Sequence, residues 1–228
     1  MNQFHVTERF VSINGEARRA GELSCFVRFA GCNLCCNYCD TRWSCDPEVE
    51  CELLTAKELH TWILDCGVTN VTLTGGEPLL APGIEELLRE LGQDSALRIE
   101  VETNGAVSLR SVIDIPGNIS YTMDLKCPGS GMAEHMLWEN YKLLRPEDTV
   151  KCVVSDRQDL DWVRDKLEER HLIGTSKQTD HAMVYISPVF GRIHPKEIVD
   201  YMKEYKMNDV RLQLQLHKYI WNPEKRGV

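Results

Sequence analysis

Residues 31–41 read Gly-Cys-Asn-Leu-Cys-Cys-Asn-Tyr-Cys-Asp-Thr, and within them Cys32, Cys36 and Cys39 have the spacing C-x3-C-x2-C. This spacing lets one folded-back loop offer three thiolates to three corners of an iron–sulfur cube. A cubane that serves only electron transfer normally has four cysteine ligands, one for each iron. With three ligands, the fourth iron stays open and can chelate a small molecule. The loop, taken as residues 31–46, therefore predicts a catalytic 4Fe-4S cluster.

The same loop can also be divided into two abutting C-x2-C pairs, Cys32 with Cys35 and Cys36 with Cys39, a spacing typical of zinc sites. Structural zinc sites usually separate their two pairs by roughly a dozen residues or more, so that two loops converge on the metal. Abutting pairs would strain a single tetrahedron, which favours the cluster, although Cys35 remains a competing ligand. The other cysteines are spread singly and indicate small buried side chains rather than a disulfide framework; they are Cys25, Cys45, Cys51, Cys66, Cys127 and Cys152.

Composition favours one soluble domain over residues 1–228. The chain is 43% hydrophobic, and a chain of this length can bury roughly 70–75% of its unfolded surface. No apolar run approaches the roughly 20 residues of a membrane span. The net charge of −9 argues against a nucleic-acid binder, which would carry a basic stripe. Ten cysteines without an apolar leader predict a reducing, cytoplasmic location.

Short β-branched runs alternate with amphipathic stretches along the chain. We expect strands at 24–30, 70–74, 97–102, 119–125, 149–154, 183–187 and 210–216, and helices at 55–66, 83–92, 133–144, 156–169 and 195–205. Thr55 and Glu58 form a capping box at the start of the first helix, and Gly67 ends it. Strands that alternate with helices pair in parallel through βαβ units. The pattern therefore predicts an α/β fold, a partial (β/α)6-type barrel that is open on one side.

The cysteine loop closely resembles that of the radical S-adenosylmethionine (SAM) superfamily. The resemblance implies that SAM binds the open iron, and that an electron from the reduced cluster cleaves it to a radical that abstracts a substrate hydrogen. Thr74-Gly75-Gly76-Glu77-Pro78 follows the second expected strand and resembles the GGE-P motif of the superfamily. Gly76 lets the backbone approach a ligand closely, and the Glu77 carboxylate can accept a hydrogen bond from the SAM ammonium. An ordinary strand-to-helix turn is the alternative for this motif.

Three further stretches at expected strand ends are candidates for the SAM site, where ligands of such sheets bind. Glu102-Thr103-Asn104-Gly105 resembles the E-T-N-G of many superfamily members, although an Asn-Gly turn would look the same. Asp124-Leu125-Lys126 could hold the SAM carboxylate and ribose, with a solvated strand end as the alternative. Ser187 is a candidate on the adenine side. Tyr38 lies where the superfamily often has an aromatic residue near the adenine, and loop packing is its alternative.

Resemblance to one family covers nearly the whole chain. The similar stretches are Ser12-Ile13-Asn14-Gly15-Glu16, Phe26-Val27-Arg28, Cys39-Asp40-Thr41, Asp124-Leu125-Lys126-Cys127-Pro128 and the tail from Arg211 to Val228. They resemble the 7-carboxy-7-deazaguanine synthases of the queuosine pathway of tRNA modification. The resemblance implies a carbon–nitrogen lyase that converts 6-carboxy-5,6,7,8-tetrahydropterin to 7-carboxy-7-deazaguanine, contracting a ring with loss of ammonia. It also implies a homodimer and an electron donor such as flavodoxin or ferredoxin.

The residue types fit a pterin that carries a carboxylate. Arg28 offers a planar fork for that carboxylate, and a structural ion pair is its alternative. The resemblance implies that the pterin edge is bound by backbone groups of Ile13, Asn14 and Gly15 and by Thr74, with His217 as a further pocket residue. It also brings the Val228 carboxylate to the substrate, where a frayed end is the alternative.

Magnesium is a further cofactor that the resemblance implies, with Thr41 at the position of its protein ligand. A hydroxyl oxygen suits Mg2+ if substrate and water complete an octahedron. A loop cap is the alternative for this residue. The sequence alone assigns no other side chain to the metal.

Two residues depart from the S-I-Q-G-E-G usual in the family, since Asn14 replaces the glutamine and Ala17 the last glycine. Asparagine is tolerable if the position acts through its backbone. If it acts through its side chain, the shorter asparagine reaches less far toward the pterin. A rival enzyme class is the glycyl-radical activases, which would need neither Arg28 nor Thr41. A rival without enzymatic activity is a zinc or iron–sulfur binding module, which predicts a fourth ligand and does not explain the Gly-Gly-Glu-Pro turn.

Overall fold

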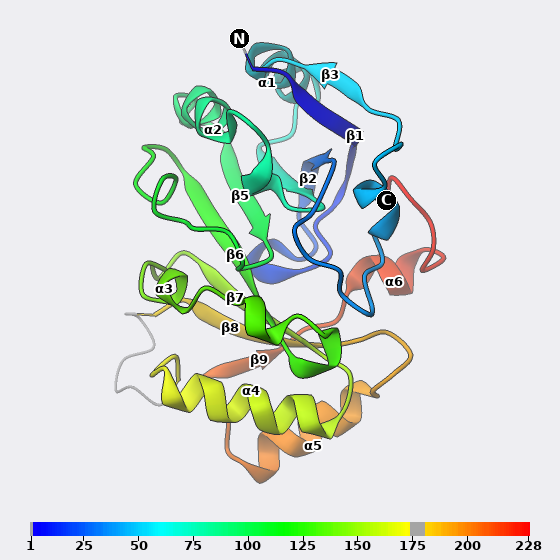
Figure 1. Ribbon diagram of the computed structural model, residues 1–228, viewed down its shortest axis with the longest axis vertical. Coiled ribbons are helices and arrows are strands. Elements are labelled where there is room, and N and C mark those ends of the chain that lie inside the picture. The colour runs from blue at the N-terminus through cyan, green and yellow to red at the C-terminus, as the bar shows by residue number, and fades with distance from the viewer. Residues whose placement is uncertain (1, 174–180) are drawn as a thin grey trace.

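The computed structural model describes residues 2–173 and 181–228, which form a nine-stranded sheet in the order β3-β1-β2-β4-β5-β6-β7-β8-β9 (Figure 1). The strands are β1 Phe4–Ile13, β2 Leu23–Phe29, β3 Glu52–Leu54, β4 Asn70–Gly75, β5 Arg98–Thr103, β6 Ile119–Lys126, β7 Thr149–Val154, β8 Met183–Pro188 and β9 Val210–Leu212. The α-helices are α1 Ala56–Asp65, α2 Ile84–Gly92, α3 Trp138–Tyr141, α4 Arg157–Glu169, α5 Pro195–Glu204 and α6 Leu216–Ile220. Figure 1 shows α1 and α2 near the β1 end of the sheet and α4 and α5 near the β9 end.

Parallel pairing from β2 through β4 to β9 confirms the expected α/β architecture. In the described residues the sheet runs from β3 to β9 without closing on itself, so the barrel is open. The sequence-based prediction did not include β1 and β3, which pair antiparallel at one edge. The parallel register sets Arg28 beside Thr74 and Asp124 beside Lys151. Side chains from distant parts of the chain therefore meet at one end of the sheet.

The capping box predicted for the first helix is present. The Thr55 hydroxyl accepts from the Glu58 amide at 3.3 Å, and the Glu58 carboxylate accepts from the Thr55 amide at 2.8 Å. These two bonds satisfy amides that otherwise lack partners at a helix start. A capping box also opens α5, where His194 and Glu197 exchange bonds and Pro195 occupies the first turn.

The helix predicted over 133–144 is wrong in extent. The chain forms a 3-10 helix at Ala133–His135 and the single turn α3. The amide of Leu137 donates to the Gly105 carbonyl instead of a helical partner, and the Asn140 side chain bonds Val107 and Leu109. Contacts with the loop after β5 therefore override the local helical pattern.

The strand predicted over 210–216 is too long. It ends at Leu212, and Leu216 begins α6. The amide of Leu216 donates to the Gly15 carbonyl at 3.1 Å, which draws the chain out of the sheet toward the N-terminal loop. The β-like residue pattern of 210–216 gives no sign of this long-range bond, so the sequence did not reveal where the strand ends.

The barrel interior contains a buried polar network around Glu100, which is 3% exposed. Its carboxylate accepts from the Asn14 amide at 2.7 Å and from the Thr122 hydroxyl at 2.5 Å. Burial, followed by repulsion from Glu102, raises the pKa of Glu100 to about 7. The network extends to Thr72, which is 2.8 Å from the hydroxyl of Ser24.

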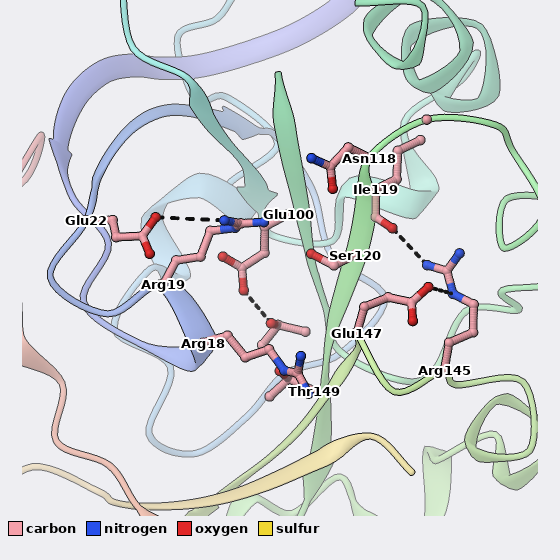
Figure 2. Close-up of a pocket in the computed structure, with 12 residues that line it drawn as sticks. Arg18, Arg19, Glu22, Glu100, Asn118, Ile119, Ser120, Arg145, Glu147 and Thr149 are labelled. Carbon is pink, nitrogen blue, oxygen red and sulfur yellow. Dashed lines mark hydrogen bonds and ion pairs between the residues drawn. The ribbon is translucent and has the colours of Figure 1, made fainter. Parts of the chain in front are cut away.

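A cavity of about 400 Å³ opens beside Glu100, at the end of the sheet where β6 and β7 begin. Figure 2 shows its charged side chains gathered in pairs, with Arg19 next to Glu22 and Arg145 next to Glu147. Ligands of parallel α/β sheets bind at the opposite, carboxyl ends of the strands. This cavity is therefore not the candidate active site.

None of the helices in residues 2–173 and 181–228 has both the length and the apolar character needed to cross a membrane.

Candidate active site

The cysteine loop is fastened to the carboxyl ends of the parallel strands. The Glu77 amide, after β4, donates to the Gly31 carbonyl at 2.8 Å. The Asn37 amide donates to the Ser130 carbonyl, beyond β6, at 2.9 Å. The Tyr38 hydroxyl donates to the Val153 carbonyl on β7 at 2.9 Å. The loop therefore extends across three strand ends, where a ligand bound to it would face the barrel.

The three predicted cluster ligands differ from Cys35 in their surroundings. Cys36 is 8% exposed, Cys32 and Cys39 are partly buried, and Cys35 is exposed. Burial raises the pKa of the Cys36 thiol, and the neighbouring Lys126 ammonium acts in the opposite direction. The sulfur of Cys32 lies within hydrogen-bonding distance of the Leu34 amide and the Asn104 side chain, at 3.4 and 3.5 Å. Donors to sulfur stabilise a thiolate, which supports Cys32 as a ligand. Within the described residues, no three Cys, His, Asp or Glu side chains are gathered closely enough to hold a metal ion without rearrangement.

The glycine turn after β4 touches the cysteine loop directly. A Cβ on Gly76 would collide with the Gly31 carbonyl and lie 3.0 Å from the Cβ of Cys32. Gly75 has φ of 152°, and a Cβ there would meet the backbone of Phe29. Only residues without a Cβ let the two loops approach so closely. The turn therefore places its main chain beside the cluster ligands.

The Glu77 carboxylate is completely buried and already holds three protein donors. One oxygen accepts from the Leu79 amide at 3.0 Å and from the Thr103 hydroxyl at 2.8 Å, and the other accepts from the Asn104 amide at 2.6 Å. Burial raises its pKa to about 7 despite these bonds. The side chain thus ties the turn after β4 to the end of β5.

A row of charges crosses the ends of β6 and β7. The Lys126 ammonium is 2.5 Å from the Asp124 carboxylate, and Lys151 is 3.5 Å from Asp124 and 3.1 Å from Glu16. Burial by itself would lower the pKa of Lys151, but the Asp124, Glu16 and Glu102 carboxylates raise it well above its usual value. Lys151 therefore stays an ammonium within a mostly acidic cluster.

Unsatisfied polar atoms gather at this end of the sheet. In the described residues, four buried side-chain atoms lack a hydrogen-bond partner, and three of them belong to Glu16, Asp124 and Ser187. Ser187 is completely buried near the end of β8. Because buried polar groups are normally paired, such a concentration indicates groups kept for a ligand. Asp124 and Ser187 are two of the predicted SAM residues, so the donor and acceptor set fits this cofactor.

Arg28 lies on β2, and its Nε donates to the Glu8 carboxylate on β1 at 2.7 Å. This bond is the structural ion pair considered as its alternative, but it leaves the two terminal nitrogens of the guanidinium for other acceptors. Thr41 has its hydroxyl 3.8 Å from the sulfur of Cys39, directly after the cluster ligands. Arg28 is paired in the sheet with Thr74, and Thr41 lies beside Cys39.

The C-terminal segment returns to the cysteine loop. Lys218 pairs with Asp40 at 2.8 Å, and Arg226 stacks 4.0 Å above the Trp43 ring. The ring of His217 contacts Gly15, where a Cβ would be 2.5 Å from its Nδ1. Burial lowers the pKa of His217, so the imidazole is neutral near pH 7. The tail is therefore close to the loop, and Val228, two residues beyond Arg226, remains a predicted contact.

The backbone and the side chain of Asn14 are both hydrogen-bonded within the protein. Its amide donates to the Glu22 carbonyl and its carbonyl accepts from Gly21, each at 2.7 Å. Its side chain donates to Glu100 and Thr72 inside the barrel. Asn14 is 1% exposed, so it supports the loop after β1 from inside the barrel. The shorter side chain noted in the sequence serves this internal contact.

Sequence reasoning missed Glu16, Lys151 and Glu102 as pocket residues. Glu16 lies inside the quoted family motif, and Glu102 inside the quoted E-T-N-G stretch, so both were visible without being assigned a role. Lys151 is a charged residue in a buried strand pattern, a signal that could have been recognised. Leu125 is fully buried on β6 between its two charged neighbours, and Ile13 ends β1.

Comparison with known proteins identifies the family of this chain. The family model described as Radical SAM superfamily matches residues 26–118. A 7-carboxy-7-deazaguanine synthase from Clostridium acetobutylicum is 54% identical over 99% of this chain and 99% of its own length. The synthase from Chlorobaculum tepidum is 34% identical over 98% of this chain and 97% of its own.

The fold has a close structural counterpart. The crystal structure of QueE from Escherichia coli superposes with a TM-score of 0.71, covering 94% of this chain and 95% of that one at 18% identity. Such identity supports the fold only, whereas the whole-length identities above establish the family. This chain belongs to the 7-carboxy-7-deazaguanine synthase family of the radical SAM superfamily.

Proposed function

We propose that this protein converts 6-carboxy-5,6,7,8-tetrahydropterin to 7-carboxy-7-deazaguanine, with ring contraction and loss of ammonia. The observation that carries the proposal is 54% identity to a 7-carboxy-7-deazaguanine synthase over 99% of both chains. The protein is accordingly a radical SAM lyase that uses a 4Fe-4S cluster and SAM. When bound, the reduced cluster and SAM supply the radical that abstracts hydrogen from the substrate.

Cys32, Cys36 and Cys39 would hold the cluster, because they have the C-x3-C-x2-C spacing and are buried or partly buried, whereas Cys35 is exposed. The Gly75-Gly76 main chain would receive the SAM ammonium, and Glu77 would act by fixing that turn through its three internal bonds. The remaining SAM contacts would come from Tyr38, Asp124, Leu125, Lys126 and Ser187. The buried Ser187 hydroxyl, which has no hydrogen-bond partner among the described residues, supports this assignment, as does the Asp124 carboxylate, whose Oδ1 has only the 3.5 Å ion pair with Lys151.

Arg28 would hold the substrate carboxylate with the nitrogens that Glu8 leaves free. Gly15, Ile13 and Thr74 would line the pterin edge together with His217 and the Val228 carboxylate. Asn14 would contribute by supporting this loop from inside the barrel. Mg2+ would bind beside the substrate through the Thr41 hydroxyl, because a hard oxygen ligand suits that ion.

The residues also suit the control of protons and water during the reaction. Lys151 keeps its proton beside Glu16 and Asp124, while the neutral His217 can accept one. Buried groups around the substrate exclude water and other hydrogen donors. We further propose that residues 1–228 act as one catalytic domain, as a homodimer, with a flavodoxin or ferredoxin as electron donor.

Anaerobic turnover with the carboxytetrahydropterin, SAM, Mg2+ and a reductant tests the proposal. Product with the mass of 7-carboxy-7-deazaguanine should form with the cluster-loaded protein and be absent with Cys32→Ala. Cleavage of SAM without this product would reject the substrate assignment. Activation of a glycyl-radical enzyme in the same assay would favour the rival activase function.

A further inference from the structure

Gln213 joins the two ends of the open barrel through its side chain. Its Oε1 accepts from the Ala17 amide at 2.6 Å, and its Nε2 donates to the Ala17 carbonyl at 2.8 Å. Both polar atoms of the side-chain amide thus bind the main chain of one residue, Ala17, and Gln213 is only 8% exposed. Its own amide donates to Ile186 on β8 at 2.9 Å, which anchors it to the sheet. The side chain therefore acts as a clamp between the last strand and the first loop.

The clamp controls the residue before Ala17. Ala17 has φ of 55°, whereas Glu16 is extended at φ −145° and ψ 178°. This reversal of the chain turns Glu16 inward, where it pairs with Lys151 at 3.1 Å, while Arg18 is exposed. Since a non-glycine residue at positive φ is strained, the conformation requires outside support. The two bonds from Gln213 provide that support.

Glu16 has one carboxylate oxygen that the protein does not use. The residue is 8% exposed, and within the described residues its Oε1 has no hydrogen-bond partner. A carboxylate can only accept hydrogen bonds, and leaving a buried acceptor unpaired is costly. His217 and Lys151, both close enough to interact with Glu16 electrostatically, flank it in the pocket. The free oxygen is therefore suited to a ligand that brings an N–H donor.

We propose that Gln213 is a positioning residue that holds Glu16 at the substrate, where the free Oε1 accepts a hydrogen bond from an N–H group of the pterin. This inference rests on the proposed function, since a reduced pterin carries several such groups on its ring and amine. A carboxylate acceptor in a pocket closed to water forms a strong, charge-assisted bond of this kind. Gln213 itself does not touch the substrate.

The test compares three variants of the cluster-loaded protein. Gln213→Leu removes both hydrogen bonds to Ala17. Gln213→Glu keeps only the hydrogen bond in which the side-chain oxygen accepts from the Ala17 backbone amide. Gln215→Leu is the matched control, because Gln215 lies two residues away and its side chain caps nothing. Binding of the carboxytetrahydropterin is measured by anaerobic calorimetry with SAM and Mg2+ but without a reductant. Iron content and SAM affinity are measured on the same samples.

Gln213→Leu should weaken pterin binding by ~10-fold to 100-fold, as expected for the loss of two positioning hydrogen bonds. Gln213→Glu should fall between this variant and the wild type, and Gln215→Leu should match the wild type. Iron content and SAM affinity should stay unchanged in all three. A purely structural role would instead lower all three measurements together. Unchanged pterin binding in Gln213→Leu would overturn the proposal.

A double-mutant cycle tests whether the clamp acts through Glu16. Glu16→Gln should weaken pterin binding on its own, and adding Gln213→Leu should cost little more, because the residue being positioned has been changed. Additive losses would show that Gln213 acts by another route and would overturn the inference. If Gln213→Leu does not fold, the same cycle is run with Gln213→Glu, which keeps size and one bond.

Different results would reject the proposed function and the positioning role of Gln213. Absence of pterin binding and product with the wild-type protein would reject the proposed function. Normal wild-type turnover combined with normal binding by the Gln213 variants would reject only the positioning role.

Discussion

Ala17 shows how one residue can be held against its own backbone preference. Its φ of 55° lies in the left-handed region, where a Cβ costs roughly 1–2 kcal/mol. The related family motif has glycine here, which carries no such cost. The chain offsets the strain with the two bonds from Gln213. The conformation is therefore a property of the assembled barrel rather than of the loop.

Ala17→Gly should leave the free energy of unfolding unchanged or raise it by up to about 1 kcal/mol. Relief of the strain exceeds or balances the greater freedom that glycine gives the unfolded chain, which costs about 0.4–1 kcal/mol. Ala20→Gly is the matched control, because Ala20 has φ of −50° and should lose about that amount. Denaturant unfolding of both variants measures the difference. Equal destabilisation at the two positions would contradict the explanation.

Glu100 should make stability depend on pH. Burial, followed by repulsion from Glu102, raises its pKa from 4.5 to about 7 in the folded protein. Between these values the folded chain retains a proton that the unfolded chain has lost. The free energy of unfolding must then fall as pH rises through this window. Arg19 and the bonds from Asn14 and Thr122 act in the opposite direction without cancelling the shift.

Glu100→Gln should flatten this pH dependence, because the amide cannot titrate. The substitution should remove at most about 3 kcal/mol of the change in the free energy of unfolding between the unfolded and folded pKa values of Glu100. Denaturant midpoints of the anaerobic, cluster-loaded protein between pH 4.5 and 8 provide the measurement, with the exposed Glu85→Gln as control. A slope in Glu100→Gln equal to that of the wild type would exclude Glu100 as the titrating group.

At the scale of elements, the cysteine loop depends on its neighbours for its shape. It contains only the short 3-10 helix Arg42–Cys45, and its order comes from bonds to the ends of β4, β6 and β7. Arg42 adds a bond to the Cys36 carbonyl at 2.8 Å. These anchors turn Cys36 inward and leave Cys35 exposed. The shape of the loop is therefore set by contacts with the strand ends rather than by its own secondary structure.

Replacing Cys36 with alanine should prevent cluster assembly, whereas Cys35→Ala should retain it. The two residues are adjacent and cannot both occupy the middle corner of the cube. Iron per chain after anaerobic reconstitution measures the difference, with Cys32→Ala and Cys39→Ala as further ligand variants. The assignment is wrong if Cys35→Ala loses iron while Cys36→Ala keeps it.

At the scale of the whole molecule, the open sheet leaves two edges. The edge strands β3 and β9 have three residues each, so little backbone is available for unwanted pairing. Large hydrophobic side chains are nevertheless exposed, including Leu53 on the edge strand β3 and Tyr219 and Ile220 on α6. Exposed apolar groups of this kind favour association.

We expect the protein to be a homodimer, with about twice the chain mass of 26.1 kDa. Dimerisation would cover a sheet edge and exposed apolar side chains that a monomer leaves in water. Sedimentation velocity of the cluster-loaded protein at micromolar concentration measures the mass, and a dilution series serves as control. A monomer across the whole series would contradict this expectation.

Much of the fold and the cluster position could be read from local patterns. The spacing of Cys32, Cys36 and Cys39 is set within one short loop, so the sequence alone shows it. Strand runs, the Thr55 capping box and the glycines of the turn after β4 are equally local signals. They located six of the seven parallel strands closely. The errors at 133–144 and 210–216 arose where bonds to Gly105 and Gly15 redirected the chain.

The sequence by itself therefore determined the class of chemistry and the positions of most parallel strands, because both depend on residues close together in the chain. Only the tertiary structure decided how individual side chains are used. Glu16 and Lys151 are 135 residues apart, and Ala17 and Gln213 are 196 apart, yet each pair is in contact. No local pattern encodes such partners, because a charge or an amide is equally compatible with solvent, with a ligand and with burial. The choice is made when the strands pair and bring these groups to the same end of the sheet.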